Sequence, residues 1–273
     1  MILTLDVRRA RKGDCLLLHY GTKTKPGLML IDGGPAKVYK PHLKPRLKQI
    51  RKARGLAANE TLPIDLLMVS HIDDDHINGI LQLTKELVDA HDSQQPLPFK
   101  IRSLWHNSFD DIIGNRPDEL VASVTASYGA ASLGGDADVA GFSPDTAKVL
   151  ASVNQGFRLR DDARKLRLRN KELGQTLVMA KAGAAPLDMG KSLTFTVVGP
   201  MKDELEKLQK DHDAFLEDKQ NDNDTEATLA AFTDSSVANL SSLVVLAESD
   251  GKRILLTGDA RGDKILKGLE LTG

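Results

Sequence analysis

The sequence predicts a mixed α+β fold, and three features of its pattern lead to that prediction. The first thirty residues alternate short apolar runs with turn residues, which is typical of antiparallel strands joined by tight turns. Apolar residues then recur at helical spacing at Leu43, Leu47 and Ile50. Farther on, an apolar strand over 64–70 leads into a polar motif and then into an amphipathic helix. Strand, polar loop and helix in this order place side chains at the carboxyl end of a strand, where ligands of α/β folds commonly bind.

The second half of the chain continues the mixture of helices and strands. Residues 115–190 combine Ala- and Leu-rich segments with glycine breaks and predict a helical insertion. Residues 193–198 predict a strand, 202–218 a charged amphipathic helix, and the wholly polar run 217–224 an exposed loop. The end of the chain predicts a hairpin of two strands, 243–247 and 253–257, joined by Ser249-Asp250-Gly251. We expect one domain over residues 1–273.

Composition excludes several classes of protein. The net charge is -1, so no global field attracts nucleic acid or an anionic membrane. The single cysteine, Cys15, excludes an internal disulfide and a thiolate metal cluster, and its apolar strand predicts that it is buried. No apolar run approaches the length of a membrane span. The sequence therefore predicts a soluble, cytoplasmic protein without a membrane partner.

The polar motif that follows the strand over 64–70 is the main functional signal. It reads His71-Ile72-Asp73-Asp74-Asp75-His76 and gathers two imidazoles and three carboxylates within six residues. Carboxylates this close repel one another unless a cation lies between them. An acidic, solvated loop at a helix N-terminus is the alternative, since Asp74 and Asp75 favour that position, but it explains neither histidine.

The motif resembles the signature of the metallo-β-lactamase superfamily, His-x-His-x-Asp-His, with Asp73 in place of the second histidine. The His-x-Asp-x-Asp-His form is similar to the lactamase-like domain of ComEC-type DNA-uptake proteins. Further segments of the chain occur in the family's order: Gly13-Asp14-Cys15, Leu30-Ile31-Asp32-Gly33-Gly34, Asn239-Leu240-Ser241-Ser242-Leu243 and Leu255-Leu256-Thr257-Gly258-Asp259-Ala260. The resemblance implies an αββα sandwich of the metallo-β-lactamase type.

The resemblance also implies a metal site with two divalent ions. His71 and Asp73 would ligate one ion, Asp75 and His76 the other, and Asp259 would bridge them, with Asp75 the expected catalytic residue. Metals about 3.5–4 Å apart activate a hydroxide for attack on phosphorus. The implied function is a metal-dependent phosphodiesterase or nuclease. Because Asp73 replaces an imidazole by an oxygen ligand, we expect manganese ahead of zinc.

Residues outside the motif carry less specific signals. Asp32 is expected either to orient a ligand histidine or to be a turn residue before two glycines. His106, after an expected strand at 101–105, is either an additional ligand or a structural histidine. The segment 37–54 holds eight Lys or Arg and no acid, and Lys44, Lys48 and Arg51 fall on one helical face. That face is either a phosphate-binding surface for nucleic acid or a solvated helix face.

The chain departs from the family pattern at its end. Relatives follow the Gly-Asp motif with further strands and a His-His-Gly segment, whereas no histidine follows Asp259 here. We therefore expect a fold truncated in its C-terminal half, completed by a further segment or a companion protein. The alternative function is a non-catalytic or partner-regulated interaction module that keeps the metallo-β-lactamase scaffold.

Overall fold

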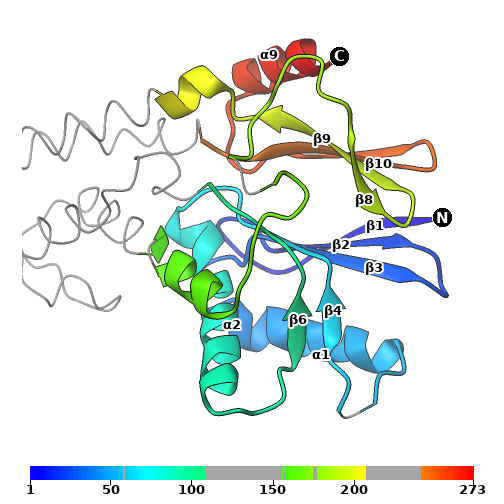
Figure 1. The fold of residues 1–273 in the computed structure, drawn as a ribbon, viewed down its shortest axis with the longest axis vertical. Helices are drawn as coiled ribbons and strands as arrows, with labels where there is room; N and C mark the ends of the chain where they lie inside the picture. The colour runs from blue at the N-terminus through cyan, green and yellow to red at the C-terminus, as the bar shows by residue number, and fades with distance from the viewer. Residues whose placement is uncertain (58, 108–154, 157, 175–176, 207–240) are drawn as a thin grey trace, which may run out of the picture.

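The computed structural model describes residues 1–57, 59–107, 155–156, 158–174, 177–206 and 241–273 (Figure 1). In this part of the chain, helices and strands are mixed and most strands belong to two sheets, which confirms the α+β prediction. The expected helical segments between 108 and 154 and the residues 207–240, including most of the expected amphipathic helix and the polar loop, lie outside the described residues.

The first sheet contains the N-terminal strands and the strands around the polar motif. Its five strands, in spatial order, are β1 (Ile2–Val7), β2 (Leu16–Gly21), β3 (Pro26–Ile31), β5 (Leu66–Met68) and β7 (Leu104–Trp105). The expected antiparallel meander is confirmed for β1, β2 and β3. β4 (Leu62–Ile64) and β6 (Phe99–Ile101) form a separate parallel pair. In the sequence, β4 directly precedes β5, and β6 directly precedes β7.

Three strands of the first sheet end at the same edge. β5 pairs parallel with both β3 and β7, so the carboxyl ends of all three point the same way. Asp32 follows β3, His71 lies just beyond β5, and His106 follows β7 directly. The topology therefore brings together three polar residues that are far apart in the sequence.

The second sheet is antiparallel throughout, in the order β11-β10-β9-β8. It comprises β8 (Leu187–Gly190), β9 (Leu193–Gly199), β10 (Val244–Ser249) and β11 (Lys252–Leu256). The C-terminal hairpin is confirmed. The prediction of a helical insertion up to 190 is wrong for 187–190, which form β8, although residues 155–156 and 158–165 are helical. The turn from β8 to β9 places Lys191 and Ser192 at φ of 56° and 63°, residue types that do not signal such a turn.

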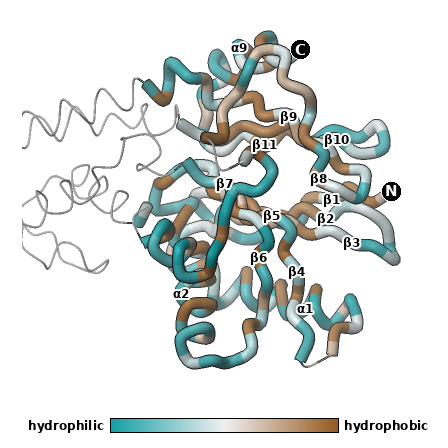
Figure 2. The backbone as a smooth tube through the Cα atoms, viewed as in Figure 1, coloured by the Kyte–Doolittle hydropathy of each residue, from teal (hydrophilic) through white to brown (hydrophobic). Residues whose placement is uncertain are grey.

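The helices cover the outer faces of the two sheets. η1 (Tyr39–Leu43), α1 (Lys44–Ala53) and α2 (Asp74–Asp92) pack on the first sheet through one core, which includes Leu17, Leu47 and Ile80. A second core fills the space between the sheets, with Trp105 against Phe195 at 5.8 Å between ring centroids. α9 (Gly262–Thr272) packs on β9, where a Cβ on Gly268 would lie 1.9 Å from a backbone oxygen. Figure 2 shows the apolar residues concentrated along these inner strands.

Asp65 connects the two sheets, because its Oδ2 accepts hydrogen bonds from Tyr20 Oη (3.0 Å) and from Lys191 Nζ (2.6 Å) in the β8–β9 turn.

Two further features bear on the sequence predictions. Cys15 is 1% exposed, so its expected burial is confirmed. No helix within the described ranges is both long enough and apolar enough to span a bilayer.

Candidate metal centre

The polar motif lies in the connection between β5 and α2. Asp73 is the N-cap residue of α2, with φ -65° and ψ 144°, and Asp74 and Asp75 occupy the first turn, where carboxylates interact favourably with the helix dipole. The backbone N–H of Gly33 donates to His76 O (2.8 Å), and that of Gly79 donates to Gly34 O (2.9 Å). A Cβ on Gly79 would lie 1.9 Å from Gly33 O, so only glycine permits this contact. The start of α2 is thereby fixed against the loop that follows β3.

Asp32 is the hub of the hydrogen bonds behind the motif. Its carboxylate is 1% exposed and accepts from the Ser70 backbone N–H (2.7 Å), from Ser70 Oγ (2.6 Å) and from His76 Nδ1 (2.9 Å). Asp32 adopts a φ of 53°, in the left-handed region, which turns the chain directly after β3. Of the two expectations for Asp32, the geometry supports the orienting role.

These hydrogen bonds determine which nitrogen of each ring is protonated. A carboxylate only accepts, so His76 Nδ1 carries a proton. Ser70 gives its single hydroxyl proton to Asp32, so its Oγ accepts from His71 Nδ1, 3.0 Å away. Both histidines therefore direct Nε2 away from Asp32, an arrangement that carboxylates commonly impose on metal-ligating imidazoles.

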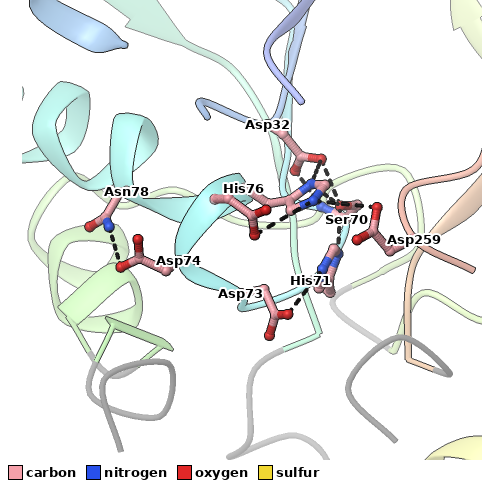
Figure 3. Close-up of polar contacts among 9 residues, drawn as sticks. Asp32, Ser70, His71, Asp73, Asp74, His76, Asn78 and Asp259 are labelled. Carbon is pink, nitrogen blue, oxygen red and sulfur yellow. Dashed lines mark hydrogen bonds and ion pairs between the residues drawn. The ribbon is translucent and has the colours of Figure 1, made fainter. Parts of the chain in front are cut away.

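The two rings and Asp259 lie around one small volume (Figure 3). The Nε2 atoms of both rings are buried and have no hydrogen-bond partner among the described residues. The rings of His71 and His76 are 4.1 Å apart, and one ligand atom of each lies within 4.8 Å of the other and of an Asp259 oxygen. Asp259 follows β11, and a positive φ of 50° at Gly258 lets its loop approach Ser70 closely. The cluster thus combines residues from both sheets.

Carboxylates surround the two imidazoles. His71 Nε2 is 3.8 Å from Asp73 Oδ2, while His76 Nε2 is 3.9 Å from Asp75 Oδ1 and 3.5 Å from Asp259 Oδ1. Asp73 is buried and Asp75 half-buried, whereas the Asp259 side chain is 47% exposed and opens the cluster to solvent. All five residues expected as ligands are therefore neighbours in space. The closest set is His71, His76 and Asp259, with Asp73 and Asp75 each beside one ring.

The electrostatics of the cluster differ between the two histidines. Burial lowers the pKa of His71, and the neighbouring His76 lowers it further, so His71 is neutral with a lone pair on Nε2. Burial also acts to lower the pKa of His76, but the hydrogen bond to Asp32 and the charges of Asp32 and Asp259 raise it to about 9. His76 is therefore an imidazolium at neutral pH whenever no other cation is present.

This arrangement fits one or two divalent metal ions. In the described part of the chain, these two buried imidazole nitrogens have no hydrogen-bond partner and lie 3.5–3.9 Å from carboxylate oxygens, so the cluster needs a positive charge between them or protons on the rings. The mixed nitrogen and oxygen donors suit zinc or manganese. The split into a His71–Asp73 pair and a His76–Asp75 pair on either side of Asp259 is compatible with these distances.

Sequence reasoning did not assign a role to two residues near the cluster. Asp14 has a carboxylate oxygen within 4.8 Å of ligand atoms of Asp32 and His76, and burial followed by the charge of Asp32 raises its pKa. Gln155 donates from Nε2 to Asp74 Oδ1 (2.8 Å) at the start of α2. A sequence feature could have pointed to Asp14, because it lies in the Gly13-Asp14-Cys15 segment, one of those that carry the family resemblance. Gln155 had no such feature.

Two other expected sites have different environments. The Nε2 of His106 is shielded from solvent and burial lowers the pKa of the ring to about 4, but it is not among the converging ligand atoms of the described residues. On α1, Lys44 Nζ binds Glu86 (2.7 Å), and the Arg51 guanidinium binds the backbone oxygens of Ala57 and Glu60. Two of the three residues of the expected basic face are therefore engaged within the protein.

Comparison with known proteins identifies no relative. The chain matches no family model, no curated protein and no solved structure. Any inference about function therefore depends on the residues and geometry of the chain itself.

Proposed function

We propose that this chain is a metal-dependent hydrolase of phosphodiesters, built on a metallo-β-lactamase-like scaffold. One observation carries the proposal: among the described residues, the Nε2 atoms of His71 and His76 are buried without a hydrogen-bond partner and lie 3.5–3.9 Å from carboxylate oxygens, in a cluster that the exposed Asp259 opens to solvent. The large majority of buried polar side-chain atoms are hydrogen-bonded, so two adjacent rings that both lack such a bond at Nε2 favour a ligand between them. The two stacked sheets with helices outside, and the order of the motifs along the chain, support the scaffold.

The ligands divide into two groups in this proposal. His71 and Asp73 would hold one cation and Asp75 and His76 the second, with Asp259 as a ligand available to both. A pair of divalent cations supplies Lewis-acid activation of water and neutralises the charge that develops at phosphorus. Manganese is favoured over zinc because the set contains three carboxylates beside two imidazoles.

The remaining residues position the ligands and the substrate. Asp32 and Ser70 hold both imidazoles with Nε2 toward the reaction side, so the ligands need no reorganisation when the substrate arrives. Asp75 is half-buried beside the opening, and its Oδ1 is the acceptor we assign to the proton of the attacking water. Asp259, the most exposed of the five, borders the space where the scissile phosphate would lie.

Hydrolysis of bis(p-nitrophenyl) phosphate in the presence of Mn²⁺ tests the proposal. We expect turnover that EDTA abolishes and that Asp259→Asn lowers by at least about 100-fold, since even residues that only support metal ligands are worth about 10–100-fold. Asp263→Asn is the control, because Asp263 is similarly exposed and pairs with the neighbouring Arg261, away from the cluster. Equal turnover by both variants would contradict the assignment. Hydrolysis of p-nitrophenyl butyrate alone would show that the substrates are carboxylic esters and not phosphodiesters.

A further inference from the structure

The loop between β1 and β2 carries four basic residues that the proposed chemistry does not use. Arg8, Arg9, Arg11 and Lys12 fall within five positions. The loop is closed by a hydrogen bond from Arg8 N to Cys15 O (2.9 Å), and Ala10, 6% exposed, is inserted into the core beneath it. Arg11 and Gly13 adopt left-handed φ values of 62° and 68°. The loop therefore has a defined shape.

This basic loop, residues 8–13, borders the candidate metal centre. A Cβ on Gly13 would lie 1.8 Å from the backbone oxygen of Asp75, so the two backbones are in direct contact at the start of α2. The next residue, Asp14, has its carboxylate within 4.8 Å of Asp32 and His76. The basic residues therefore lie only a few positions before Gly13 and Asp14 in the sequence, and the loop meets the ligand cluster beside Asp75.

Three of the four basic side chains are free of acidic partners in the described part of the chain. Arg8 pairs with Asp6 at 2.8 Å. Arg9, Arg11 and Lys12 are exposed, and no ion pair joins any of them to an acidic group of the described ranges. Elsewhere an exposed cation is neutralised, as Arg102 is by Asp65. The positive charge of the loop is therefore available to a ligand.

We propose that Arg9, Arg11 and Lys12 bind the phosphate backbone of a nucleic acid whose scissile phosphate lies at the metal centre. The inference rests on the proposed function and names its substrate class. A single phosphodiester carries one negative charge, which the metal ions would neutralise, so three further cations match the flanking phosphates of a polymer. Backbone contacts of this kind position the strand without selecting its sequence.

The test is fluorescence anisotropy of a labelled single-stranded oligo-dT with the full chain, in EDTA so that no hydrolysis occurs. We expect the variant Arg9→Gln, Arg11→Asn, Lys12→Gln to bind at least about tenfold more weakly at about 50 mM salt. Its log-affinity should also depend less on log-salt, with a slope smaller by about 2, since each single-strand phosphate contact contributes about 0.7. Asparagine is used at Arg11 because it tolerates the left-handed φ.

Two further variants complete the design. Lys23→Gln, Lys100→Gln, Lys252→Gln removes the same charge from exposed positions outside the loop and should bind within about twofold of wild type. Arg9→Lys, Arg11→Lys retains the charge and should keep most of the affinity. Equal weakening by the loop and control variants, or no binding by the wild type, overturns the proposal. Because binding is measured without metal, a failure of hydrolysis alone leaves this result intact.

Discussion

Replacing Asp32 by alanine is expected to lower the free energy of unfolding of the metal-free protein by about 3–5 kcal/mol. The substitution leaves three buried donors without their acceptor: the backbone N–H and hydroxyl of Ser70 and the Nδ1–H of His76. One of these belongs to an imidazolium, so the loss includes an uncompensated buried charge. Chemical denaturation at pH 7.5 measures the effect.

A matched control separates this loss from backbone strain. Asp32 and Asp250 share a left-handed φ, 53° and 52°, but Asp250 lies in the exposed turn of the C-terminal hairpin and pairs with the N-terminal amino group at 3.4 Å. Asp250→Ala therefore reports the cost of alanine in this conformation, about 1 kcal/mol. If Asp32→Ala is no more destabilising than Asp250→Ala, the hydrogen bonds of Asp32 to Ser70 and His76 do not stabilise the fold.

Metal affinity is expected to rise with pH, by up to about tenfold per pH unit for the proton displaced from His76. The hydrogen bond and charge of Asp32 outweigh burial and raise the pKa of His76 to about 9, so at pH 7.5 a metal ion must displace the Nε2 proton. The rise should level off above pH 9. In the metal-free protein, the same interaction stabilises the fold fully below about pH 6.5, and this stabilisation is lost as the pH rises through about 9.

Calorimetric titration with Mn²⁺ in buffers of different ionisation enthalpy measures the released proton. Asp32→Asn removes the charge that keeps His76 protonated, so this variant should release a smaller fraction of a proton at pH 7.5. An affinity that is the same at pH 6.5 and pH 8.5, with no dependence on the buffer, would show that no protonated imidazole lies at the metal site.

The sequence predicted those parts of the fold where local pattern and tertiary structure agree. The antiparallel strands of residues 2–31 and the C-terminal hairpin have turns with glycine or aspartate, which prefer the required backbone angles. The strand-loop-helix around His71 was also predicted, because an apolar strand and a helix dipole both favour the observed ends of the motif. The same short segment contains four of the five expected metal ligands within six residues.

Other features depend on contacts that no local pattern records. β8 was not predicted, because Lys191 and Ser192 form the turn between β8 and β9 and neither residue type favours a positive φ. Asp14 approaches His76 only because Gly13 allows the loop to touch the backbone of Asp75. Likewise, Lys44 of the basic face expected on α1 pairs with Glu86 on α2, an acid 42 residues farther along the chain. The free cations near the site come instead from the loop between β1 and β2.

Metal content, determined by elemental analysis of protein purified without chelator and loaded with Mn²⁺, shows whether the cluster around His71 and His76 binds metal. We predict about two equivalents in the wild type and almost none in a folded His71→Ala, His76→Ala variant. The control, His42→Ala, His91→Ala, removes two histidines that belong to neither group of converging ligand atoms and should retain the wild-type content. Equal metal in all three proteins would contradict the assignment of these residues as a metal centre.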